Sequence, residues 1–177
     1  MTFKKFAFIP VIVGVLALFI QVVDQLLAPS VLPVGNSGFG WIAFQSWALY
    51  FLAGCSVQGG IKVLLSYIAG IAGSILIMVW GGAMPALGFF AFPIAVGSVT
   101  CAICFLERTT WLSMVPASFI GAGAFFGFMT YVPGATFGAA AATELIYCVA
   151  GLIFGYVAVK LRVAYEGAVS EGEAEQK

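Results

Sequence analysis

Residues 6–27 read FAFIPVIVGVLALFIQVVDQLL, and this stretch decides the fold class. A helix needs about 20 predominantly apolar residues to cross the hydrocarbon core of a bilayer. The polar side chains Gln21, Asp24 and Gln25 come only near the end of the stretch. Strands of a transmembrane β-barrel alternate apolar and polar residues. Because this run is continuously apolar, it predicts a transmembrane helix.

The composition of the whole chain agrees with this prediction. Of 177 residues, 63% are hydrophobic and 8% are charged, and the mean hydropathy is +1.13. Soluble domains contain about 45–50% apolar and about 25% charged residues, and a chain of this size could not bury so much apolar surface in water. The chain is therefore expected to reside in a lipid bilayer. Its formal net charge of zero gives no indication of a nucleic-acid partner.

Six stretches are long and apolar enough to span the membrane. They cover residues 6–27, 38–57, 61–80, 84–106, 110–131 and 138–159. We therefore predict an all-α fold, a polytopic membrane helix bundle of six transmembrane helices in residues 1–162. Residues 163–177 are polar and acidic, and they are expected to form a partly disordered cytoplasmic tail. Pro93 and Pro116 are expected to interrupt the fourth and fifth helices.

The basic residues orient this bundle. With six spans, all of them fall on one side of the membrane, and they are Lys4, Lys5, Lys62, Arg108, Lys160, Arg162 and Lys177. Short cytoplasmic loops carry the excess of Lys and Arg in membrane proteins. Both termini are therefore expected to be cytoplasmic.

Two acidic residues fall inside predicted spans, Asp24 in the first and Glu144 in the sixth. Counting from the helix ends places both one to two turns below the outer surface, at a depth similar to that of Gln45. No basic residue is expected on that side, and an unpaired buried charge is costly. A shared proton, hydration in an outer vestibule or a bound cation would each resolve this cost. A structural reading also stands, in which the acids reach water at the interface and make only local hydrogen bonds.

Small residues recur at helical spacing in the last two spans. Gly123 and Gly127 form one GxxxG sequence, and Gly151 and Gly155 form another. Glycines four residues apart let helix backbones approach closely. They predict either packing within the bundle or the interface of a homo-oligomer. A weaker internal similarity relates residues 66–72 to residues 118–124, both of which begin with serine.

The sequence offers little for catalysis or for a cofactor. It contains no histidine, and its four cysteines fall within predicted spans. Cys101 and Cys104 form a CxxC sequence, but it lies within a span and has no second pair or histidine to complete a metal site. No nucleophile–base pair or phosphate-binding loop is present. We therefore expect no enzyme activity, no cofactor and no metal site.

Three separated segments carry a family resemblance. CSVQGGIKV (55–63), VPASFIGAGAFF (115–126) and GLIFGY (151–156) resemble, in this order, segments of a family of bacterial inner-membrane proteins of unknown function that includes the enterobacterial inner membrane protein YcdZ. The resemblance implies a compact helix bundle in the bacterial cytoplasmic membrane, and it implies no substrate. Within the first segment, Gly59 and Gly60 are expected to form a tight turn between two helices, with Lys62 at the inner interface.

These observations favour a small-solute channel or carrier for a neutral or weakly cationic solute. The outer part of its path would contain Gln21, Asp24, Gln25, Gln45 and Glu144, and the inner end would contain Gln58 and Lys62. The alternative is a structural or accessory subunit of a membrane complex, which docks a partner through its GxxxG faces and has no transport activity of its own.

Overall fold

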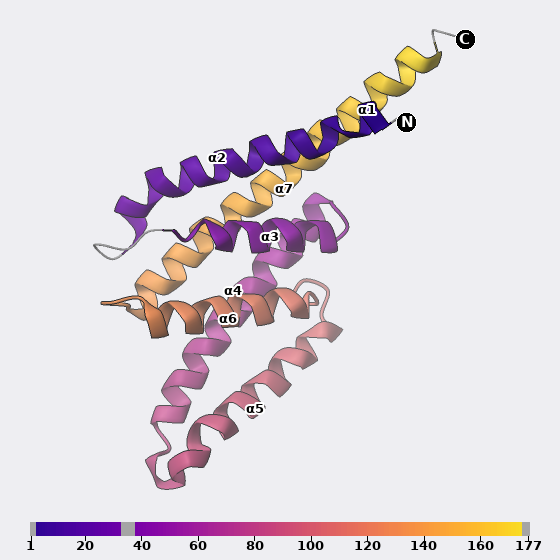
Figure 1. Ribbon diagram of the computed structural model, residues 1–177. Coiled ribbons are helices and arrows are strands. Elements are labelled where there is room, and N and C mark those ends of the chain that lie inside the picture. The colour runs from indigo at the N-terminus through magenta and orange to yellow at the C-terminus, as the bar shows by residue number, and fades with distance from the viewer. Residues whose placement is uncertain (1–2, 33–37, 175–177) are drawn as a thin grey trace.

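A computed structural model describes residues 3–32 and 38–174, and every regular element in these ranges is helical. Six helices form the body of the protein (Figure 1). They are α2 (Phe8–Val31), α3 (Gly40–Leu52), α4 (Val57–Gly82), α5 (Ala91–Phe105), α6 (Val115–Tyr131) and α7 (Phe137–Ala174). Three short elements accompany them: α1 (Phe3–Phe6), η1 (Pro85–Phe90) and η2 (Leu106–Arg108).

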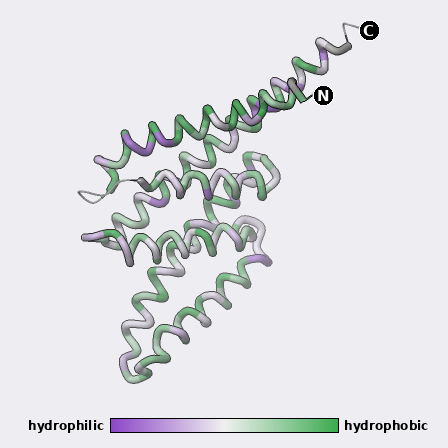
Figure 2. Tube along the Cα trace, viewed as in Figure 1, coloured by the Kyte–Doolittle hydropathy of each residue, from purple (hydrophilic) through white to green (hydrophobic). Residues whose placement is uncertain are grey.

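Four segments are long and apolar enough to cross a membrane, which makes this a multi-pass membrane protein. They are Phe8–Val31, Val57–Gly82, Pro85–Arg108 and Phe137–Gly172. Helix α6 is a shorter apolar helix of 17 residues, and α3 has only 13 residues, about 20 Å at 1.5 Å per residue. Hydrophobic colour dominates the trace in Figure 2, and a hydrophilic patch interrupts α2 toward the end away from the N-terminus.

Helices α3 and α7 form a closely packed parallel pair. A Cβ atom placed on Gly151 would lie 2.0 Å from the Ala43 carbonyl oxygen, and one on Gly155 would lie 3.0 Å from the Trp47 ring. The contact advances in the same direction along both helices, which shows that they run parallel. Helix α2 packs antiparallel to α7, since the rings of Phe8 and Tyr165 stack at 5.2 Å.

Helices α4 and α6 form a second parallel pair. Ser118 Oγ donates a hydrogen bond to the Ser66 carbonyl at 2.8 Å, and Ser74 Oγ donates to the Ala122 carbonyl at 3.3 Å. A Cβ atom on Gly70 would lie 2.0 Å from the Ser118 carbonyl oxygen. The two similar segments, 66–72 and 118–124, therefore pack directly against each other. Helix α5 covers the other side of α4.

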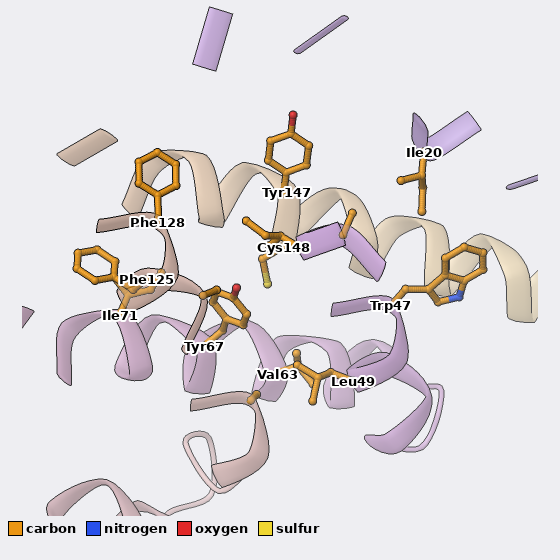
Figure 3. Packing of buried hydrophobic residues seen from close by; sticks show 14 of the residues in the cluster. Ile20, Trp47, Leu49, Val63, Tyr67, Ile71, Phe125, Phe128, Tyr147 and Cys148 are labelled. Atoms are coloured by element: carbon orange, nitrogen blue, oxygen red, sulfur yellow. The ribbon is translucent and has the colours of Figure 1, made fainter. Parts of the chain in front are cut away.

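The hydrophobic core lies where these two pairs meet (Figure 3). Tyr67 and Ile71 enter it from α4, Phe125 and Phe128 from α6, and Cys148 from α7. Each of these side chains is buried, with Tyr67, Phe125 and Cys148 at 0% exposure. The core thus joins the α3–α7 pair to the α4–α6 pair.

Both ends of the described chain lie on the right-hand side of Figure 1, together with the α3–α4 and α5–α6 connections. The basic residues Lys62, Arg108, Lys160 and Arg162 belong to the segments at this end. Lys177 lies outside the described residues. The acidic residues Asp24 and Glu144 lie toward the opposite end, near the last turns of α2 and the first turns of α7.

The prediction of a turn at Gly59 and Gly60 is wrong. Helix α3 ends at Leu52, and the chain turns at Gly54 and Cys55, with φ of 85° and 55°. The Ser56 hydroxyl then caps α4 by accepting a hydrogen bond from the Gly59 N–H at 3.0 Å. Gly59 lies in the first turn of α4. It packs so closely on the end of α3 that a Cβ atom there would be 2.3 Å from the Ala53 carbonyl oxygen.

Two further boundaries differ from the prediction. Pro116 lies in the first turn of α6, where a proline costs no helical hydrogen bond, so it starts this helix and does not interrupt it. Helix α7 continues from the last apolar segment to Ala174, through most of the segment that was expected to be a partly disordered tail. An ion pair one turn apart, Arg162 Nε to Glu166 Oε1 at 2.9 Å, accompanies this extension.

Candidate functional site

The side chain of Asp24 is buried between α2, α7 and the start of α3, with 4% of its surface exposed. Its Oδ1 atom accepts a hydrogen bond from the Tyr147 hydroxyl at 2.6 Å and another from the Phe39 backbone N–H at 3.2 Å. Gly40 permits this approach, since a Cβ atom there would lie 2.9 Å from Gln21 Nε2 and 3.3 Å from Asp24 Cβ. Protein donors therefore take the place of water at the Asp24 carboxyl group.

The carboxyl group of Glu144, unlike that of Asp24, makes no hydrogen bond within the described residues. It is 0% exposed, and neither carboxyl oxygen has a hydrogen-bond partner among the described residues. The Tyr67 hydroxyl of α4, also buried, is close enough to interact with the carboxyl group but lies outside hydrogen-bonding geometry. Three oxygen atoms of two buried side chains thus face one another without a completed bond. Buried polar groups without a hydrogen-bond partner are rare in folded proteins, and they indicate a bound ion or water, or a functional role.

Helix α7 carries the two acid–tyrosine pairs on its two sides. Figure 3 shows Tyr147 directed away from α4, toward α2, whereas Cys148 and Tyr67 are directed into the space between α7 and α4. Glu144 precedes Tyr147 by three residues and Cys148 by four, so Asp24 lies within one turn of Glu144 along α7. The Thr143 hydroxyl further fixes this level of α7 by donating to the Val31 carbonyl at 3.2 Å.

No basic side chain in the described ranges forms an ion pair or a hydrogen bond with Asp24 or Glu144. The ion pair that the structure gives, Arg162 with Glu166, lies 18 residues beyond Glu144 along α7, about 27 Å away. Each carboxyl group instead faces a phenol. The level of the two acids is consequently rich in hydrogen-bond acceptors and lacks positive charge.

The remaining predicted path residues are dispersed. Gln45 is half-buried on α3, and its buried Oε1 has no partner within the described part of the chain. Gln21 and Gln25 are exposed on α2, although the Gln21 amide reaches Gly40. Gln58 is exposed in the first turn of α4, and Lys62 is half-buried one turn later. The structure therefore brings Gln21 close to Asp24. It leaves Gln58 and Lys62 nine and five residues before Tyr67 on α4, about 14 and 8 Å along the helix from the contact with Glu144.

The two GxxxG sequences also occupy different surroundings. Gly151 and Gly155 are buried against α3, whereas no atom lies within 4 Å of a Cβ position on Gly123 or Gly127. The cavity bordered by Gly123, of about 260 Å³, lies between α4, α5 and α6. A second groove of about 530 Å³ is lined by Ile9, Phe51, Ala158 and Arg162 among others. Neither volume is lined by Asp24 or Glu144, which are 4% and 0% exposed.

Sequence reasoning missed the partners of both acids, Tyr147 and Tyr67. The spacing of Tyr147 three residues after Glu144 gave its level along the helix, but it did not indicate that its partner is Asp24 of α2. Tyr67 belongs to the segment 66–72, which attracted attention only for its similarity to residues 118–124.

Comparison with known proteins gives one result. A family model described as "Protein of unknown function (DUF1097)" matches residues 10–162, which include the six helices up to the middle of α7. No curated protein and no solved structure matches the chain.

Proposed function

We propose that this chain, which belongs to this family of proteins of unknown function, is a small-solute carrier of the bacterial inner membrane. Its solute would be neutral or weakly cationic. The site would lie where α2, α7 and α4 meet, at the level of Asp24 and Glu144. The bacterial membrane rests on the resemblance of the segments at 55–63, 115–126 and 151–156.

The observation that carries this proposal is the unpartnered carboxyl group of Glu144. An ionisable group inside a membrane span is expensive and usually serves a solute or ion path. A protein selected for stability alone could place an apolar side chain here, and an apolar replacement of a buried charged group is often neutral or stabilising. Glu144 is therefore best explained by a species that binds to it during the working cycle.

A carrier accounts for the closed site better than an open channel does. Helices α3 and α7 are locked together by Gly151, and α4 and α6 by Gly70, each by close backbone approach. The Glu144–Tyr67 contact lies between these two units. Many carriers work by rocking one helical unit against another around a central site. Movement of α7 relative to α4 would open the site at Glu144 without breaking either tight pair.

The chemistry of the site sets the class of solute. Carboxyl and phenol oxygens accept hydrogen bonds and favour positive charge, so amides, polyols, short alcohols and amines fit the site. Anions do not, because no basic side chain in the described residues approaches either acid. By the positive-inside rule we expect both termini in the cytoplasm and the start of α7, with Glu144, toward the outer side.

The test is transport by the purified protein in liposomes. Swelling and shrinkage are measured with urea, small amides, short alcohols, polyols and amines. We expect a rate increase for one class, which falls at least about tenfold in Glu144→Gln and Asp24→Asn, the loss expected when a hydrogen bond to a charged group is removed. Glu171→Gln is the matched control because Glu171 is an exposed acid on the same helix. Wild-type rates for every solute in both site variants would remove the assignment.

The second candidate is a structural or accessory subunit, and one observation favours it. Gly123 is exposed beside a cavity of about 260 Å³ lined by Thr100, Phe119 and Phe126, a surface that a helix of a second copy or of another membrane protein could cover. Isolation from native membranes in a mild detergent discriminates the two. A stoichiometric second protein that is lost in Gly123→Leu, together with no transport of any solute, would favour the accessory role.

A further inference from the structure

We propose that the species bound by Glu144 in this conformation is a proton, and that Glu144 is the site at which the protein takes up and releases protons. The role of this proton site rests on the proposed function, because in a carrier such a site would couple solute movement to the proton gradient. The occupancy of the site itself rests on geometry alone.

The groups described around Glu144 supply no positive charge. The titratable groups that face it are Tyr67 from α4 and Cys148 on α7, while Asp24 from α2 is engaged with Tyr147 on the far side of α7. On α3 the polar group beside Cys148 is the neutral Ser46, whose hydroxyl donates to the Ala43 carbonyl at 3.1 Å. The core cluster that contains Tyr67 and Cys148 also includes the rings of Phe125 and Phe128 from α6. None of these groups is a cation. An ionised Glu144 would therefore be an uncompensated charge at 0% exposure.

The second step is the size of the bound species. A metal cation without its hydration shell requires about six oxygen ligands. Glu144 and Tyr67 together offer three oxygen atoms, and both side chains are fully buried. An organic cation would need a cavity, and the cavities described above are lined by other residues. A proton requires neither additional ligands nor space.

The third step is the count of donors and acceptors. A protonated carboxyl group has one O–H donor and keeps acceptor capacity, and a tyrosine hydroxyl can both donate and accept. A small adjustment of either side chain would let this donor meet Tyr67. An ionised carboxylate only accepts, so its second oxygen would stay bare. Asp24 shows the contrast, because its Oδ1 already receives two donors, from Tyr147 and from the Phe39 N–H.

The two acids thus divide the work at one level of the membrane. Asp24 ties α2 to α7 through its hydrogen bond from Tyr147, whereas Glu144 holds a proton at the contact between α7 and α4. Displacement of α7 from α4 would bring water to Glu144, and the carboxyl O–H bond would then break with the proton passing to water and the electron pair staying on the carboxylate. The return movement reverses the transfer, with no other reactant.

Infrared spectroscopy of the full-length protein in liposomes tests the occupancy directly. A protonated carboxylic acid gives a carbonyl stretching band that a carboxylate lacks. We expect this band at neutral pH in the wild-type protein, its loss in Glu144→Gln and its retention in Asp24→Asn. Uniform labelling of glutamate with ¹³C in the wild-type chain shifts the band and assigns it to glutamate without any substitution.

The outcomes separate this inference from the proposed function. A band that is absent in the folded wild-type protein at neutral pH, or that disappears when Na⁺ or K⁺ is added at constant pH, overturns the proton site in favour of an ionised or cation-bound carboxylate. A Glu144 band together with no transport of any solute keeps the proton site and removes the carrier assignment. Solute transport without the band removes only the proton site.

Discussion

The two GxxxG sequences are equivalent on paper, and the structure predicts opposite outcomes when the first glycine of each is replaced by alanine. In Gly151→Ala the new Cβ atom would lie 2.0 Å from the Ala43 carbonyl oxygen and 2.1 Å from Ser46 Oγ. In Gly123→Ala the new atom would have no neighbour within 4 Å. The same change of one methyl group thus tests whether these contacts hold the bundle together.

The magnitude follows from the distances. Real Cβ contacts essentially never fall below 3.0 Å, so α3 must withdraw from α7 by about 1 Å, the difference between 3.0 Å and 2.0 Å. A gap of that size forfeits a quarter to a half of the dispersion energy across the contact, and overpacking typically costs about 1–3 kcal/mol. We expect Gly151→Ala at the upper end of this range. Gly123→Ala should be neutral or stabilising by up to about 1 kcal/mol, since alanine is the better helix former.

The free energy of unfolding is measured by titrating the protein from a mild detergent into dodecyl sulfate, with helical circular dichroism as the signal. Chromatography with light scattering reports the oligomeric state of each variant in the mild detergent. Equal destabilisation of the unfolding equilibrium by the two variants, or a neutral Gly151→Ala, would refute the packing argument. A change in oligomeric state confined to Gly123→Ala would instead show that α6 contacts a second copy.

The remaining predictions concern the two acid–tyrosine pairs and use the same unfolding assay. Tyr147→Phe removes the shorter of two hydrogen bonds to Asp24 Oδ1 and should destabilise the protein by about 1–2 kcal/mol, because Asp24 keeps the Phe39 N–H. Tyr131→Phe, at an 83% exposed tyrosine, is its control, and an equal effect of the two would contradict the role of the bond. Glu144→Leu replaces an unsatisfied carboxyl group by an apolar side chain and should be neutral or stabilising by about 1–3 kcal/mol while abolishing transport. A loss of stability comparable with that of Gly151→Ala would show that Glu144 has a structural role.

Sequence reasoning recovered the helical class and four long spans because hydrophobic length alone determines them. The predicted spans at 38–57 and 110–131 correspond to the shorter helices α3, with 13 residues, and α6, with 17 residues. It misplaced the start of α4, since two consecutive glycines are typical of a turn and their use in a close approach to Ala53 depends on the neighbouring segment. It likewise expected Pro116 within a helix, where the chain uses it to begin one. Both errors concern residues with two common structural uses that only tertiary contacts separate.

The candidate site was predictable only in part, for a related reason. Counting residues from helix ends gives the depth of Asp24 and Glu144, but it does not give the rotation of each helix about its axis. Tyr147 and Tyr67 stand in apolar runs where an aromatic residue is ordinarily core. Rotation decides that Tyr147 meets Asp24 while Glu144 turns to the other side of α7. The two acids therefore make separate contacts with different helices at one level of α7, where the sequence predicted one shared outer mouth.

This separation explains why two apolar membrane spans each contain a carboxyl group, with unequal hydrogen bonding. The contact between α2 and α7 is completed by Asp24, Tyr147 and Thr143, so it gains stability from its polar groups. The contact between α7 and α4 leaves the Glu144 carboxyl group and the Tyr67 hydroxyl without hydrogen bonds. Burying them in this way costs stability, which selection for packing alone would not favour. The incomplete contact lies between two helix pairs that are each fixed by backbone approach of glycine. A weak contact between two rigid units allows the units to move relative to each other. A ligand that completes the missing hydrogen bonds at this contact would favour one arrangement of the units over the other.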